Sequence, residues 1–157
     1  MYTRILAAND GSPGGQKALS AAIELARKLS AELHTVTVEE LPRFPASIDE
    51  IAEEKDEANH RFAPIIAAAK AKASAAGVKI ETHLVPGHVA EAIVRLIKER
   101  GFDLLVVGFM GHSQLYERII GGTTDRLVRL APCAVLVVKK IALRPSRHST
   151  SGMREPG

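Results

Sequence analysis

Short apolar runs alternate along the chain with longer segments in which apolar residues recur every three or four positions. The first apolar run, Thr3–Asp10, ends in polar residues, and the segment that follows it has helical spacing. Ser12 is suited to cap this helix and Pro13 to occupy its first turn. Because strand and helix patterns keep alternating, we expect an α/β fold with a parallel sheet and helices on both faces.

The same periodicities predict the approximate bounds of the later elements. Strands are expected at 32–40, 78–87, 102–108 and 132–139, and helices at 48–76, 88–101 and 122–130. Pro64 lies inside the longest helix and is expected to kink or split it near Arg61 and Phe62. Gly101 is suited to end the third helix.

Glycines cluster after the fourth predicted strand. Gly108 and Gly111 are followed, after nine residues, by Gly121, and Gly122–Thr124 then open a helix. A helix N-terminus offers unpaired N–H groups and a positive dipole end, which favour a phosphate, and the threonines add hydroxyl groups. The spacing alone leaves an alternative open, in which the glycines only make tight turns and the threonines only cap the helix. The sequence contains neither a Walker A loop nor a dinucleotide fingerprint after the first strand.

The net charge of +3 is concentrated near the C-terminus. Five basic residues and one acidic residue from Lys139 onward carry +4, which leaves −1 for residues 1–138. A near-neutral body with 4% aromatic residues is not typical of a protein that binds nucleic acid. Residues 141–157 are rich in Ser, Pro, Gly and Arg and are expected to form a flexible basic tail after a single domain at 1–140.

The remaining composition favours a cytoplasmic protein that does not enter a membrane. No apolar run approaches the roughly 18 residues of a membrane span, and the first residues lack an export signal. The single cysteine, Cys133, excludes a disulfide framework and is expected to be a buried, unreactive thiol. The histidines show no metal-ligand spacing with it or with one another, so we expect no zinc site. These histidines are His34, His60, His83, His88, His112 and His148.

Two stretches of the chain resemble the universal stress protein family. The stretches are "GFMGHSQLYERIIGGTTDRLVRLAPCAVLVVK" and "RILAANDGSPGGQKALSAAIELARKLSAELHTVTV", and the resemblance covers roughly residues 1–140. It implies an open five-stranded parallel sheet of order 3-2-1-4-5, which is Rossmann-like and similar to the adenine nucleotide alpha hydrolases. It also implies a homodimer through the last strand, Ala134–Val138, whose apolar edge would otherwise be exposed.

The resemblance to ATP-binding members of the family implies a nucleotide site. Asp10 would lie near the ribose and phosphates, although Asp-Gly-Ser is also ordinary turn chemistry. Val38 would meet adenine through its backbone, and Val107 and Gly108 would flank the ribose. A triphosphate would bring Mg²⁺. The implied residues are Ala8, Asn9, Asp10, Val38, Val107, Gly108, Gly111, His112, Gly121, Gly122, Thr123 and Thr124.

One departure from the family pattern falls on the phosphate site. The family has Ser or Thr directly after the third glycine, where this chain has Gly122. One lost neutral hydrogen bond costs about 0.5–1.5 kcal/mol, or up to roughly tenfold in affinity. His112 could help to hold a phosphate when protonated, or it could be an exposed loop residue without a role.

Two functions are therefore expected to compete. The first is a stress-response or regulatory protein that binds ATP, ADP or AMP and whose nucleotide state alters loop Phe109–Ile120 and a surface for an unknown partner. The second is a nucleotide-free dimeric stress or scaffold protein, which Gly122 favours. No hydrolytic set of residues is evident, so the chain is at most a slow ATPase. Arg118 and Arg126 are equally well explained by surface salt bridges.

Overall fold

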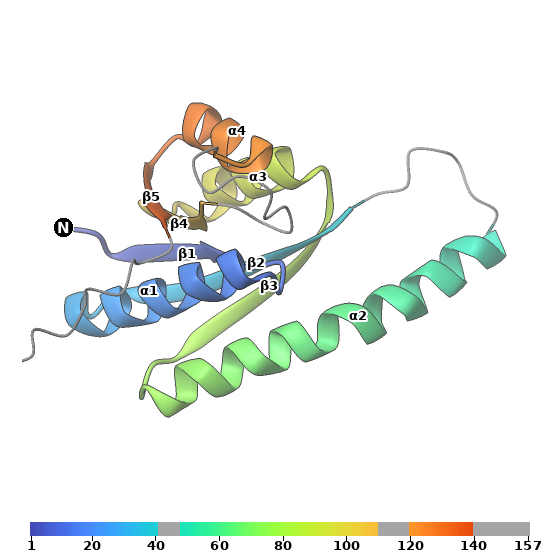
Figure 1. The fold of residues 1–157 in the computed structure, drawn as a ribbon, viewed down its shortest axis with the longest axis horizontal. Coiled ribbons are helices and arrows are strands. Elements are labelled where there is room, and N and C mark those ends of the chain that lie inside the picture. Colours follow the sequence, from blue (N-terminus) through green and yellow to red (C-terminus); the bar gives the residue numbers. More distant parts are fainter. Residues whose placement is uncertain (41–47, 110–119, 140–157) are drawn as a thin grey trace, which may run out of the picture.

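The structure is a computed structural model that describes residues 1–40, 48–109 and 120–139, with side chains described from residue 60 in the second range. Five parallel strands form one sheet of order β3-β2-β1-β4-β5, which confirms the predicted fold (Figure 1). The strands are β1 (Arg4–Ala8), β2 (Glu32–Glu40), β3 (Ile80–Gly87), β4 (Leu104–Gly108) and β5 (Ala134–Val138). The helices are α1 (Pro13–Leu29), α2 (Ile48–Ala75), α3 (Val89–Arg100) and α4 (Gly122–Leu130).

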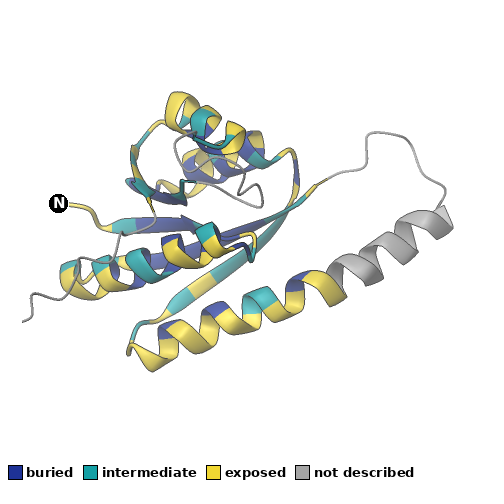
Figure 2. Cartoon of the chain, viewed as in Figure 1, coloured by how far each residue is buried: buried dark blue, intermediate teal, exposed yellow. Residues whose placement is uncertain are grey.

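Helices cover both faces of the sheet. Helices α1 and α2 pack on one face and helices α3 and α4 on the other, and the residues between the layers are buried (Figure 2). On one side Ile5 and Ala7 of β1 meet α1, and on the other Leu6 meets the cluster that contains Ile93 of α3. Because alternate residues of β1 enter opposite cores, the strand is apolar from Ile5 to Ala8, and it lies at the centre of the sheet.

Local signals in the sequence set the ends of the helices. The Ser12 side chain accepts a hydrogen bond from the Gly15 N–H at 3.1 Å, and Pro13 is the first residue of α1, as predicted. Helix α3 ends at Gly101, whose φ of 68° lies in the left-handed region that glycine adopts without strain.

The predicted split of the long helix is wrong. Helix α2 continues across Pro64 from Ile48 to Ala75. Proline removes one hydrogen bond and crowds the preceding turn. In α2, however, Phe62 lies before Pro64 and Ala69 lies after it, and both side chains are buried. Packing on both sides of the proline offsets this cost, so the helix continues through Pro64, which itself is exposed. A kink at Pro64 stays a prediction.

The edge of the sheet and the surface charges bear on possible partners. Among the residues that the structure describes, strand β5 pairs only with β4, and Leu136 on β5 is 39% exposed.

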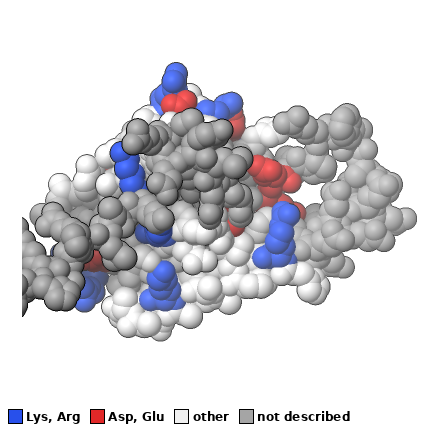
Figure 3. All heavy atoms as spheres, in the orientation of Figure 1, with Lys and Arg blue, Asp and Glu red and all other residues white. Residues whose placement is uncertain are grey.

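Lys and Arg side chains are scattered among uncharged residues on the face shown in Figure 3, without a single basic patch among the described atoms. Within the described residues, no helix combines the length and the apolar character that crossing a membrane would require.

Candidate functional site

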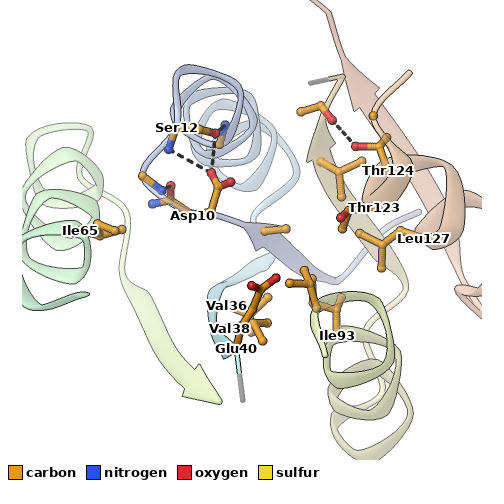
Figure 4. Close-up of a pocket in the computed structure, with 18 of the residues that line it drawn as sticks. Asp10, Ser12, Val36, Val38, Glu40, Ile65, Ile93, Thr123, Thr124 and Leu127 are labelled. Carbon is orange, nitrogen blue, oxygen red and sulfur yellow. Dashed lines mark hydrogen bonds between the residues drawn. The ribbon is translucent and has the colours of Figure 1, made fainter. Parts of the chain in front are cut away.

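A cavity of about 800 Å³ opens where β1, β2 and β4 end and where α4 begins (Figure 4). The chain leaves β1 toward α1 on one face and leaves β4 toward the helices of the other face, so the cavity lies at the point where the strand order reverses. Open α/β sheets bind ligands at this position. The predicted residues that line the cavity are Ala8, Asn9, Asp10, Val38, Val107, Gly108, Gly121, Gly122, Thr123 and Thr124. Gly111 and His112 lie outside the described residues.

Asp10 both forms a turn and lines the cavity. Its Oδ1 accepts hydrogen bonds from the backbone N–H of Ser12, at 3.0 Å, and from the Ser12 hydroxyl. The neighbouring Asn9 Oδ1 accepts from the Gly11 N–H at 3.0 Å. The two side chains therefore fold the β1–α1 connection into a fixed turn at the edge of the cavity. The turn interpretation and the site interpretation of Asp10 are compatible.

Two glycines are required for close packing around this turn. A Cβ on Gly15 would lie 2.7 Å from Asp10 Oδ1 and 3.0 Å from Asn9 Oδ1. A Cβ on Gly108 would lie 2.6 Å from the carbonyl carbon and oxygen of Gly14. Gly108 was expected beside a ribose, and the structure shows that it also lets α1 approach β4 closely. Gly15 was not predicted, although the Gly-Gly pair after Pro13 is a visible signal of such an approach.

The start of α4 presents backbone N–H groups to the cavity. Gly121 is the N-cap residue of α4 and has an extended backbone conformation. Because glycine has no side chain, no side-chain hydrogen bond caps the helix. The N–H of Gly121 donates to the carbonyl of Phe109 at 3.1 Å, which ties the helix start to the end of β4. The first-turn N–H groups of Gly122–Thr124 have no hydrogen-bond partner within the part of the chain that the structure describes. Such groups, with the positive end of the helix dipole, suit an anion.

The two threonines of the motif have different roles. The Thr124 hydroxyl is buried and donates to the carbonyl of Gly108 at 2.8 Å, so its hydrogen fixes α4 against β4. Thr123 is exposed and lines the cavity, as does Gly122. A Cβ on Gly122 would meet no atom within 4 Å. Of the two threonine hydroxyls, the one of Thr124 therefore already donates its hydrogen within the protein, whereas the one of Thr123 makes no such bond among the described residues.

The backbone of Val38 faces the cavity. Strand β1 pairs with β2 only as far as Ala8 opposite Val36. The Val36 carbonyl accepts a hydrogen bond from the Asn9 N–H at 3.0 Å, so Val36 directs its backbone toward β1. Alternate residues of a strand direct their N–H and C=O groups to the same side. The backbone groups of Val38 therefore point past the end of β1, toward the cavity.

Several residues that line the cavity were not predicted. An apolar wall comes from β2, α3 and α4 and includes Ile93 of α3. Helix α2 adds residues from a segment without any motif, so only the tertiary structure reveals them. The unpredicted lining residues are Gly11, Ser12, Gly15, Val36, Glu40, Arg61, Phe62, Ile65, Val89, Ile93 and Leu127.

The described charges around the cavity are few and of both signs. The carboxylates of Asp10 and Glu40 and the guanidinium of Arg61 line it. The Arg61 guanidinium lies over the ring of Phe62, 4.5 Å from the ring centroid. A phosphate at α4 would therefore depend on backbone N–H groups more than on cationic side chains of the described residues.

Other candidate residues have mainly structural surroundings. Burial raises the pKa of the Cys133 thiol, which agrees with an unreactive cysteine. Arg126 forms an ion pair with Glu91, as the salt-bridge interpretation predicted, whereas Arg118 lies outside the described residues. Spacing along the sequence did not predict that His34 and His83 meet across two neighbouring strands, where His34 Nδ1 lies 2.9 Å from His83 Nε2.

The fold and the cavity together define an α/β protein with a cavity at the switch point of a doubly wound sheet. The sequence profile of the universal stress protein family matches residues 1–139. The chain therefore belongs to the universal stress protein family, as the two quoted stretches indicated.

Individual relatives agree with this membership. Universal stress protein YxiE of Bacillus subtilis is 34% identical over 151 residues, covering 88% of this chain and 100% of that protein. The structure of universal stress protein UspA from Lactobacillus plantarum has a TM-score of 0.77 at 25% identity, covering 88% of this chain and 98% of that chain. A universal stress protein solved in complex with cAMP has a TM-score of 0.69 at 29% identity, covering 87% of this chain and 97% of that chain.

Proposed function

We propose that this chain binds an adenine nucleotide in the cavity between β1, β2, β4 and α4, and that it acts as a nucleotide-dependent stress-response or regulatory protein. The observation that carries the proposal is the pairing of two walls in one cavity: an apolar wall from β2 and α3, and a polar end at the start of α4. The volume of about 800 Å³ lies within the usual range for small-molecule sites. The family member solved with cAMP supports the choice of an adenine nucleotide.

The walls suggest how the nucleotide would lie. The adenine ring would pack between Val36 and Ile93, with the open backbone of Val38 donating to and accepting from its edge. The ribose would lie between the Asp10 turn and the end of β4, next to Val107 and Gly108. The phosphates would then reach the N–H groups of Gly122 and Thr123, with Gly111 and His112 predicted to complete the cradle.

The charged side chains at the cavity bear on how many phosphates the bound nucleotide would carry. ATP, ADP and AMP share the adenosine contacts, but each added phosphate brings negative charge toward Asp10 and Glu40. Mg²⁺ would offset this charge, and carboxylate oxygens are among the ligands that it prefers. Asp10 fits this role because its bonds from Ser12 fix the orientation of the carboxylate at the cavity. We therefore propose that ATP binds together with Mg²⁺.

The regulatory role would follow from the segment that joins β4 to α4. Loop Phe109–Ile120 lies between the ribose and phosphate positions in the sequence, so nucleotide binding would alter it and the surface offered to a protein partner. We also propose a homodimer through β5, because Leu136 is exposed on that edge strand. Sedimentation equilibrium of the wild type and of Leu136→Lys tests the dimer. A cytoplasmic location stays a prediction that rests on the sequence.

A second function is favoured by one specific observation. Gly122 supplies no hydroxyl, and the Thr124 hydroxyl already donates to Gly108, so the phosphate end has fewer donors than the motif suggests. In this alternative the chain is a nucleotide-free dimeric scaffold protein, and the glycine motif serves packing alone. Neither function requires a catalytic residue, and we assign none. Any ATP hydrolysis by the protein would be slow.

Small molecules released by denaturing the purified protein, identified by mass, distinguish the two functions. The proposal expects AMP, ADP or ATP in the released fraction, or saturable ATP binding by calorimetry in millimolar Mg²⁺. Absence of both would favour the scaffold function.

A further inference from the structure

His34, Glu81 and His83 meet at the end of the sheet opposite to the nucleotide cavity. His34 lies near the start of β2, and its register partner on β3 is Glu81, with His83 two residues further on. Because side chains alternate along a strand, Glu81 and His83 project from the same face of the sheet as His34. His34 also makes an edge contact with Phe102, 4.9 Å between ring centroids, which places the cluster on the face covered by α3.

The three side chains converge on one another. His34 Nδ1 lies 2.9 Å from His83 Nε2 and 3.5 Å from Glu81 Oε2. One ligand atom from each residue lies within 4.8 Å of the other two. The two rings are within 5° of parallel with centroids 5.2 Å apart, so they face each other edge to edge. Two imidazole nitrogens at this separation share a hydrogen, since two lone pairs would repel.

The cluster combines one fixed ligand with two adjustable ones. His34 is only 5% exposed and is held by Phe102, and the Glu32 carboxylate lies 3.9 Å from its other nitrogen, Nε2. Glu81 is exposed and His83 is half-buried on β3, which is an edge strand. A carboxylate behind a ligating histidine is a common arrangement in metal sites, because it orients the ring.

The two rings supply the type of ligand that a transition metal prefers, because a neutral imidazole binds a divalent metal through the lone pair of one ring nitrogen. The carboxylates of Glu32 and Glu81 both lie near His34, and their negative charge favours a cation at the cluster.

We propose that His34, Glu81 and His83 form a binding site for a divalent transition metal, of which Zn²⁺ suits the ligands best. Two imidazoles and one carboxylate leave one position of a tetrahedral zinc ion to water. Zinc–nitrogen bonds of about 2.0–2.1 Å imply nitrogen atoms about 3.3 Å apart. The nitrogens must therefore separate by a few tenths of an ångström and the rings must turn until their lone pairs converge. His83 and Glu81 can make this adjustment at the open edge of the sheet.

Two arginines compete with the metal and limit its affinity. Arg4 lies 3.0 Å from Glu32, and Arg100 lies 4.0 Å from Glu81. Both ion pairs are solvent-exposed and contribute little, so a metal can displace them. We expect one Zn²⁺ per chain with micromolar rather than nanomolar affinity. The hydrogen shared by His34 Nδ1 and His83 Nε2 must first move to the outer nitrogen of its own ring, so that both inner nitrogens can bind the metal.

Calorimetric titration of untagged, chelator-treated protein with Zn²⁺ tests the site, with Co²⁺ absorption as a spectroscopic reporter of the ligands. His83→Gln and Glu81→Gln should each weaken binding by at least about tenfold. His88→Gln is the matched control, since His88 is an exposed histidine at the start of α3 and should leave binding unchanged. Circular dichroism checks that each variant is folded.

Two outcomes would overturn the site. Wild-type protein that shows no saturable Zn²⁺ binding would mean that the two histidines only share a proton. Binding that survives both His83→Gln and Glu81→Gln, or that His88→Gln weakens equally, would place the metal elsewhere.

Discussion

Gly122→Ser should tighten nucleotide binding, because it restores a hydroxyl at the start of α4. The site can accept the side chain, since a Cβ on Gly122 would meet nothing within 4 Å and the residue is exposed. Gly122 is not among the residues with positive φ, so serine adopts its backbone conformation without strain. One added hydrogen bond contributes about 0.5–1.5 kcal/mol, which corresponds to roughly two- to tenfold in affinity.

Gly122→Ala separates the hydroxyl from the backbone effect. Replacing glycine by alanine stiffens the unfolded chain and stabilises the fold by up to about 1 kcal/mol without adding a donor. Calorimetric ATP titrations in millimolar Mg²⁺ should therefore give tighter binding for Gly122→Ser than for Gly122→Ala, with the alanine variant close to wild type. Equal affinity of the two variants would refute the role of the hydroxyl, and a gain in both would assign the effect to the backbone.

Three further predictions follow from contacts around the sheet. Gly15→Ala should destabilise the fold by about 1–3 kcal/mol in thermal unfolding and weaken nucleotide binding, because the new Cβ would lie 2.7 Å from Asp10 Oδ1. Thr124→Val should lower stability by about 1 kcal/mol in urea unfolding, since the buried hydroxyl no longer bonds to Gly108; no change would show that this bond is weak. Burial raises the pKa of Asp103, but three hydrogen bonds from Thr3 and Arg4 outweigh this and lower it overall. The lowered pKa gives stability that is present above the ordinary aspartate pKa and lost as pH falls through the folded value, so Asp103→Asn should flatten the acid limb of the stability profile.

Local features of the fold were predictable because their causes are local. The cap at Ser12 needs only a hydroxyl three residues before an N–H, and the end of α3 needs only a glycine with positive φ at Gly101. The strand order came from the resemblance to a family rather than from periodicity. The split at Pro64 was wrongly predicted because the local cost of proline is opposed by packing on both sides of it, which no window of sequence displays.

The candidate site was predictable where a motif lies next to it in the sequence. The Asp10 turn and the start of α4 carry such motifs, and both line the cavity. Arg61 and Ile65 reach the cavity from α2 only through tertiary packing. The pairing of His34 with His83 depends on the register of β2 against β3, which brings together residues 49 positions apart. The sequence signal for this cluster was the spacing of Glu81 and His83, which places both side chains on one face of a strand.

Amide chemical shifts followed by NMR during titration with ATP and Mg²⁺, and separately with AMP, test the central claim most directly. The account predicts saturable shifts of the Val38 amide at the adenine end and of the Gly122 and Thr123 amides at the phosphate end. The amides beside His34, at the far end of the sheet, should stay unchanged and serve as the internal control. Absence of saturable shifts at Val38, Gly122 and Thr123 at millimolar nucleotide would contradict a nucleotide site in this cavity.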